Sequence, residues 1–211
     1  MTDQHEFAKQ ADAMLTCAEQ SNQAFFENVV DGPDRRIALL VGGHSAEREV
    51  SIASGACVER ALDRAGHTVR IFDPAQPYLA QQLEEWAPEV VFIALHGKGG
   101  EDGRIQGFLE TIDLAYTGSG VLASALAMDK GKSKIFYRQA NLPTPPSCTI
   151  RRDAKIDDLA QYIQESIGIP CVLKPIAEGS SIGVYIIHDP SELKSAVNNA
   201  FTAHEQVLVE R

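Results

Sequence analysis

Four segments of the sequence place charged or polar side chains beside glycines, a combination that suits the binding of small charged ligands. The first segment, residues 42–51, reads GGHSAEREVS and follows a short apolar run of strand length. Paired glycines allow a tight turn, and open parallel sheets bind ligands beyond the carboxyl ends of their strands. Glu47 stands near the start of the following helical pattern, so it either stabilises that helix or binds the ammonium group of a ligand.

The second segment, residues 94–103, reads ALHGKGGEDG and follows a third, almost wholly apolar strand candidate. Its glycines permit a close approach of the backbone to a ligand or to another part of the chain. His96 stands at the end of this strand candidate, at the same predicted sheet edge as the first segment. It is therefore either an ordinary structural histidine or a hydrogen-bonding partner for the carboxylate of a ligand.

The third and fourth segments carry lysines. Residues 174–183 read KPIAEGSSIG, in which Lys174 at the end of an apolar strand leads into a glycine- and serine-rich hairpin loop. Such a loop either wraps phosphate groups with its amides and hydroxyls or is an ordinary flexible turn, and its residue order is not that of a P-loop. Residues 128–134 read MDKGKSK, a basic cluster of the kind usually found on a solvated helix face.

The elements that must position these segments alternate between strand and helix in the first part of the chain. Strand-like runs at residues 36–41, 67–73 and 89–97 are separated by helical periodicity. This alternation predicts an α/β domain with a parallel sheet, in which the run at 89–97 is buried on both faces. One long helix is predicted over residues 121–140.

Prolines 143, 145 and 146 end that helix and carry the chain into a second unit. This unit reads as strand, helix, strand, loop, strand, helix and strand. Ser191 is the expected N-cap of its last helix. The sequence ends in the apolar run VLVER, which we expect to be an exposed strand in need of a partner lobe.

The composition narrows the class of protein. Of 211 residues, 44% are hydrophobic and 23% charged, as in ordinary globular proteins. The net charge of -10 argues against nucleic acid or membrane as a partner. Four scattered cysteines without a CxxC pair indicate neither a zinc site nor a disulfide framework. No secretory signal and no membrane-spanning run is visible, so a cytoplasmic protein is expected.

Taken together, the four segments resemble the D-alanine–D-alanine ligase family of ATP-grasp enzymes. The resemblance rests on LLVGGHSAEREVSIASG, VFIALHGKGGEDGRIQGFLE, YTGSGVLASALAMDKGKSK and VLKPIAEGSSIGV. It implies a parallel-sheet N-terminal (pre-ATP-grasp) substrate domain at residues 35–120. The small α+β lobe of an ATP-grasp fold follows at 121–211, and the C-terminal lobe of the family is expected to be missing. Residues 1–34, expected to form a helical arm and linker, have no counterpart.

The resemblance implies an activity. Such ligases phosphorylate the carboxylate of one D-alanine with ATP, and the amino group of a second D-alanine then displaces the phosphate. The product, D-alanyl-D-alanine, serves peptidoglycan synthesis. Mg²⁺ is the expected metal, with its ligands in the missing lobe, and a homodimer through the N-terminal domain is expected. The alternatives are a truncated, non-catalytic binding remnant and a related ligase that uses D-lactate or D-serine as second substrate.

The resemblance also assigns residues to the substrate site. Glu47 corresponds to the carboxylate that holds the ammonium group of the first D-alanine, and Val50 follows it in the same substrate loop. His96 corresponds to a histidine near the carboxylate of that substrate. Ser180 corresponds to a serine whose hydroxyl orients the glutamate, which makes Glu47 and Ser180 the expected catalytic pair. His44 stands where relatives vary and receives no role.

A second set of residues is assigned to ATP. The expected ATP-binding residues are Lys130, Lys174, Glu178, Gly179, Ser181 and Glu210. The two lysines correspond to phosphate ligands, and the glycine–serine loop corresponds to the cover over the phosphates. Glu210 corresponds to the acid that reads the adenine amino group, and Arg211 stands where lysine is expected. No metal ligand is assigned.

Overall fold

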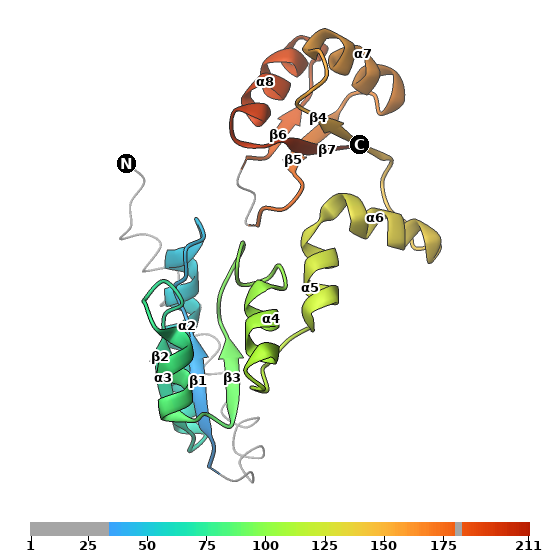
Figure 1. The fold of residues 1–211 in the computed structure, drawn as a ribbon. Helices are drawn as coiled ribbons and strands as arrows, with labels where there is room; N and C mark the ends of the chain where they lie inside the picture. Colours follow the sequence, from blue (N-terminus) through green and yellow to red (C-terminus); the bar gives the residue numbers. More distant parts are fainter. Residues whose placement is uncertain (1–33, 180–182) are drawn as a thin grey trace.

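The computed structural model describes residues 34–179 and 183–211, which fold around two sheets of different type (Figure 1). The first is parallel, in the order β2-β1-β3, and the second is antiparallel, in the order β4-β7-β5-β6. The expected combination of a parallel-sheet domain and a small α+β lobe is therefore confirmed. Residues 1–33 of the predicted arm lie outside the described residues.

The parallel sheet lies between two helical layers. Its strands are β1 Arg36–Leu40, β2 Thr68–Phe72 and β3 Val90–Ile93. The helix α2, Arg48–Arg64, packs through Val58 beside Leu39 on one face. The helices α3, Leu79–Trp86, and α4, Arg104–Thr111, cover the other face around Leu40.

The strand that is buried on both faces is β1 rather than β3. Residues 38–40 have no exposed surface, whereas in β3 Val91 alone is fully buried. The prediction for the third strand was wrong because an apolar run signals burial but not the order of strands. β3 lies on the outer side of this three-stranded sheet, and beyond it only a single bridge pairs Val91 with Tyr116.

The predicted long helix is two helices, α5 Val121–Met128 and α6 Lys130–Gln139. Asp129 between them has an extended backbone, and its side chain accepts a 2.9 Å hydrogen bond from the backbone N–H of Lys132. An aspartate in this position caps a new helix, and this local bond overrides the continuous periodicity. As a result Lys130 stands at the first position of α6 instead of inside a long helix.

The second sheet contains the strands β4 Ser147–Arg151, β5 Cys171–Pro175, β6 Tyr185–Ile187 and β7 Gln206–Glu210. The helices α7, Ile156–Ser166, and α8, Leu193–Ala203, pack on one face and enclose a core that includes Val207 and Val209. β7 lies between β4 and β5. The expectation of an exposed final strand was therefore wrong, because β7 finds both of its partner strands within this chain.

The last helix begins with a short 3-10 turn, Pro190–Glu192, and its cap is Asp189 instead of the predicted Ser191. The Asp189 side chain accepts a 2.8 Å hydrogen bond from the N–H of Ser191, and Glu192 accepts one from the N–H of Asp189. This reciprocal pair is a capping box. Proline after Asp189 fits the first position of the turn, which explains the shift by two residues.

Side chains alternate between the two faces of a strand. The residues between the core positions of the second sheet therefore point to its other face. That face carries Lys174, Leu208 and Glu210 and is overlain by α6. The predicted domain boundary after residue 120 lies between the bridge residue Tyr116 and the start of α5. The division of the chain into domains at this point stays a prediction. Among the described residues, no helix is long and apolar enough to cross a membrane.

Candidate functional site

Glu47 lies at the N-terminal end of α2, at the carboxyl edge of the parallel sheet. Only 6% of its surface is exposed, and its backbone N–H donates a 3.1 Å hydrogen bond to the Oγ of Ser45. The Ser45 hydroxyl in turn donates to the carbonyl of His96 at 2.8 Å. The first glycine-rich turn and the end of the third strand are thus joined, as the sequence predicted from their common sheet edge.

Two glycines from different loops enclose the Glu47 carboxylate. A Cβ atom added at Gly97 or at Gly179 would collide with Oε2 of Glu47. Gly97 has φ +66°, in the left-handed region that favours glycine. The buried carboxylate therefore lies where the loop after β3 and the glycine–serine loop after β5 both reach it.

A buried serine fixes the turn beneath Glu47. The Oγ of Ser51 accepts a 2.9 Å hydrogen bond from the N–H of Gly42 and donates at 2.7 Å to the carbonyl of Ala94. Ser51 has no exposed surface. Sequence reasoning missed this residue, although its place one turn into the helix after a glycine pair was a usable signal.

An ion pair holds the other side of the same turn. Arg48 donates to Asp73 at 2.6 Å and to the carbonyl of Gly43 at 2.8 Å, while Asp73 accepts the N–H of Gly43 at 2.9 Å. Burial alone would raise the pKa of Asp73, but the hydrogen bonds from Arg48, Gly43 and Ala75 outweigh it and lower the pKa to about 2. The ionised carboxylate thus stabilises the folded turn.

This pair gives the protein an acid-sensitive contribution to stability. The folded pKa of Asp73, about 2, lies below the unfolded value of 3.8, so the stabilisation is present above pH 3.8 and is lost as the pH falls towards 2. Asp73→Asn should remove this part of the pH dependence and lower the unfolding free energy at neutral pH by ~1 kcal/mol. Urea unfolding measured from neutral pH down to the pKa of Asp73 tests both effects.

Asp63→Asn is the control, because Asp63 lies exposed at the far end of α2. We expect it to leave the free energy of unfolding within ~0.5 kcal/mol of the parent value. An Asp73→Asn protein with the same acid dependence as the parent would contradict the role of the ion pair.

The loops around Glu47 line a cavity of about 560 Å³. It is lined by Gly42, Gly43, His44, Ser45, Ala46, Glu47, Pro74, Leu95, His96, Lys98, Gly99, Gly100, Arg104 and Glu178. The structure therefore brings Glu47, His96 and Glu178 together. His96 is oriented by a 3.0 Å hydrogen bond between its Nε2 and the hydroxyl of Ser54. Val50 does not line this cavity, and its side chain is 48% exposed in the first turn of α2.

Lys130 connects the cavity around Glu47 with the second sheet. Its backbone N–H donates to the carbonyl of Ile176 at 3.1 Å, and its Nζ donates to the carbonyl of Glu178 at 2.6 Å. Burial lowers the pKa of the Lys130 ammonium, and the nearby charge of Lys174 lowers it further. Two neighbouring ammonium groups of this kind favour an anionic ligand between them.

A second cavity, of about 270 Å³, brings together Lys130, Lys174 and Glu210 of the predicted ATP residues. It is lined by Ala127, Lys130, Ser133, Lys134, Tyr137, Thr144, Lys174, Leu208 and Glu210. Nζ of Lys174 lies 3.2 Å from Oε2 of Glu210, and Nζ of Lys134 lies 3.4 Å from the same oxygen. Lys134, which belongs to the basic cluster noted in the sequence, is a member of the site that sequence reasoning did not assign.

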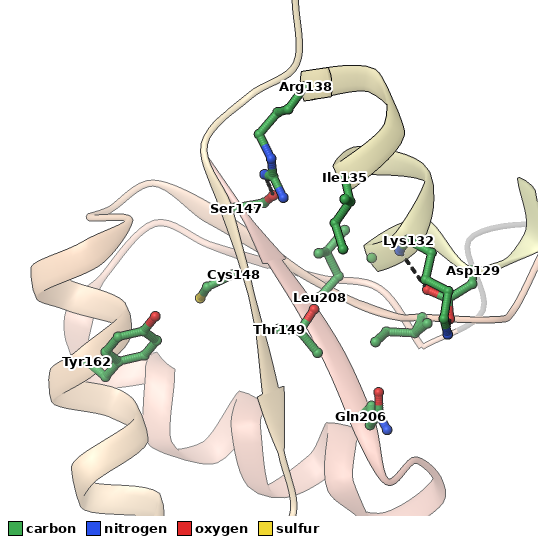
Figure 2. A pocket seen from close by; sticks show the side chains of 12 residues that line it. Asp129, Lys132, Ile135, Arg138, Ser147, Cys148, Thr149, Tyr162, Gln206 and Leu208 are labelled. Carbon is green, nitrogen blue, oxygen red and sulfur yellow. Dashed lines mark hydrogen bonds and ion pairs between the residues drawn. The ribbon is translucent and has the colours of Figure 1, made fainter. Parts of the chain in front are cut away.

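A third cavity, of about 420 Å³, lies between α6 and the outer strand β4 (Figure 2). Asp129, Thr149, Tyr162 and Gln206 are among its lining residues, and it contains none of the predicted site residues. Arg138 closes one side through a 3.5 Å contact with the hydroxyl of Ser147. Asp129 and Lys132 pair with each other here. Because the cavity contains none of the predicted site residues, it is a weaker candidate than the two cavities described above.

Ser180 and Ser181 lie outside the described residues, so their assigned roles stay predictions. Within residues 34–179 and 183–211, no three His, Cys, Asp or Glu side chains are grouped so as to hold a metal ion. The ammonium groups of Lys130 and Lys174 are donors of the kind that charged phosphate groups attract.

Two family models match the chain. The model described as D-ala D-ala ligase N-terminus matches residues 74–119, and the one described as D-ala D-ala ligase C-terminus matches residues 136–211. Together they include the whole antiparallel sheet and the strand β3 of the parallel sheet.

Curated relatives carry the same name. D-alanine–D-alanine ligase of Syntrophotalea carbinolica is 48% identical over 178 residues, which are 84% of this chain and 56% of the relative. The enzyme of Geobacter sulfurreducens is 46% identical over 176 residues, 83% of this chain and 54% of the relative. The chain thus spans about half the length of the curated relatives it matches.

Solved structures agree in fold. D-alanine–D-alanine ligase from Bacillus anthracis has a TM-score of 0.70 and 34% identity, over 83% of this chain and 57% of the other. The same enzyme complexed with ATP has a TM-score of 0.69 and 33% identity, over 83% of this chain and 58% of the other. Because family models, curated relatives and solved structures all agree, the chain belongs to the D-alanine–D-alanine ligase family.

Proposed function

We propose that the protein ligates two D-alanine molecules with ATP to give D-alanyl-D-alanine for peptidoglycan synthesis. The observation that carries this proposal is the position of the Glu47 carboxylate, which is buried and enclosed by Gly97 and Gly179. One of these glycines belongs to the substrate domain and the other to the loop expected to cover phosphate. A group bound by Glu47 therefore lies beside both loops, as phosphorylation of a bound amino acid requires.

Glu47 is proposed to hold the ammonium group of the first D-alanine, and His96 to lie near its carboxylate. A carboxylate is a poor acyl donor, because oxide is a poor leaving group. Transfer of the γ-phosphoryl group of ATP to a carboxylate oxygen releases ADP and forms an acyl phosphate. The amino nitrogen of the second D-alanine then attacks the carbonyl carbon, loses a proton, and displaces phosphate with its bonding electrons.

Lys130 and Lys174 are proposed to neutralise the phosphate groups of ATP, and Glu210 to accept the adenine amino group. ATP in this role is supported by the relative from Bacillus anthracis that is complexed with ATP. Mg²⁺ belongs to the proposal as a partner of the phosphates, with ligands outside the described residues. Ser180 is proposed to orient Glu47, and Gly179 and Ser181 to cover the phosphates. Val50, which follows Glu47 in the same loop, is proposed to belong to the substrate-binding residues.

Three broader features complete the proposal. Residues 35–120 form the substrate domain, residues 121–211 form the small ATP-grasp lobe, and residues 1–34 precede them as an arm and linker. The protein is proposed to act in the cytoplasm, where ATP is supplied, and to form a homodimer through the substrate domain. The net charge of -10 supports small-molecule partners over nucleic acid.

The native protein, as its gene encodes it, provides the test. Incubated with ATP, Mg²⁺ and D-alanine, it should release ADP and phosphate and form a dipeptide detectable by mass spectrometry. D-Lactate or D-serine added beside D-alanine tests the related ligases, since a mixed product would name the second substrate. Binding of D-alanine without any release of ADP would overturn the proposal in favour of a non-catalytic binding module.

A further inference from the structure

Lys134 is a charged residue buried inside the proposed nucleotide site. Its side chain is only 8% exposed. Its Nζ donates to the Oγ1 of Thr144 at 2.5 Å and to the carbonyl of Pro145 at 3.1 Å, and lies 3.4 Å from Oε2 of Glu210. Two of the three N–H donors of this ammonium group are thus hydrogen-bonded to the protein, and its charge is paired with Glu210. Lys134 is therefore held by groups of the protein itself.

Glu210 shares one carboxylate oxygen between two lysines. Oε2 lies 3.4 Å from Lys134 and 3.2 Å from Lys174, and the Glu210 side chain is 16% exposed. The Lys174 side chain is 27% exposed and is more accessible from the cavity than Lys134. Lys134 thus compensates the charge of Glu210 from the buried side, while Lys174 approaches it from the open side.

We propose that Lys134 is a positioning residue of the nucleotide site. It fixes Glu210 against the segment at Thr144 and Pro145, and by sharing the charge of Glu210 it weakens the hold of Glu210 on the ammonium group of Lys174. Without Lys134, Lys174 alone compensates Glu210 and is held more strongly at the carboxylate and away from a phosphate. The inference rests on the proposed function in one respect, that the ligand of this cavity is ATP.

Lys134→Met tests the inference, because methionine has a similar length and no charge. We expect the Kd and KM for ATP to rise about 10-fold, with kcat changed less than about 3-fold, since the substrate cavity around Glu47 is untouched. Lys132→Met is the matched control. It removes the same charge from the same helix at a side chain that is 62% exposed, and ATP binding should change less than 2-fold.

A double-mutant cycle separates positioning from a general loss of stability. If Lys134 acts through Glu210, Lys134→Met should weaken ATP binding by about 10-fold in the parent protein but by less than about 2-fold in a Glu210→Gln background. A loss of fold lowers the unfolding midpoint and weakens binding equally in both backgrounds. Equal effects of Lys134→Met in the two backgrounds would overturn the inference, as would an unchanged Kd for ATP.

The measurements distinguish this inference from the proposed function. Titration calorimetry with ATP and Mg²⁺ reports the nucleotide site, and release of ADP with D-alanine reports ligation. A protein that binds ATP with the expected coupling but ligates no D-alanine keeps the role of Lys134 and overturns the proposed reaction. A protein that ligates D-alanine but shows no coupling between Lys134 and Glu210 keeps the proposed reaction and overturns the role of Lys134.

Discussion

Replacement of Glu47 by glutamine is expected to lower kcat/KM for D-alanine about 100-fold while the KM for ATP stays within about 3-fold. The side chain is 6% exposed, so a substrate ammonium bound to it loses most of its water. Removing one charge from such a pair costs ~2–3 kcal/mol, because the remaining ammonium stays buried without its counter-ion. Glutamine has nearly the same size as glutamate and keeps one oxygen acceptor. The fall in kcat/KM therefore measures the contribution of the negative charge.

Glu49→Gln is the matched control for this change. Glu49 lies two residues further along α2 and is exposed, and it does not line the cavity. Steady-state kinetics with D-alanine and ATP varied separately should therefore be unchanged in this variant. If Glu47→Gln instead impaired the ATP dependence more than the D-alanine dependence, the assignment of Glu47 to the amino acid would be wrong.

The parts of the site that were predictable from the sequence depend on local signals. A glycine turn that follows an apolar strand can be read from a few residues, and parallel strands bring their carboxyl ends to one edge. For this reason the segments containing Glu47 and His96 were expected to meet, and both line the same cavity. The family resemblance then added residue roles that spacing alone left open.

The parts that were missed depend on contacts between distant residues or on competing local bonds. β7 is apolar in any arrangement, and only the pairing of β7 with β4 and β5 buries it within this chain. The helix break at Asp129 arose because a capping hydrogen bond outweighs periodicity. Lys134 has the sequence context of a solvated lysine, and its burial follows from the position of Thr144 and Pro145 after the helix ends.

The substitution Gly97→Ala is expected to impair ligation at least as much as loss of the Glu47 charge. Its methyl group would collide with Oε2 of Glu47, so either the loop or the carboxylate must move. The N–H of Gly97 also donates a 2.7 Å hydrogen bond to Glu101, which limits the movement of the loop. Displacing a binding group by ~1 Å costs roughly 100-fold in rate. We therefore expect kcat/KM for D-alanine to fall at least 100-fold, measured by ADP release.

The same substitution also places alanine at φ +66°, so the strain of that backbone must be separated from the collision. Gly66→Ala supplies the comparison, since Gly66 has φ +84°, follows the end of α2, and has open space around its Cβ position. Both variants should lose ~1 kcal/mol of stability to the left-handed conformation. The kinetic loss should appear in Gly97→Ala alone. Normal kinetics in that variant would mean that the Glu47 carboxylate does not need its place between the two loops.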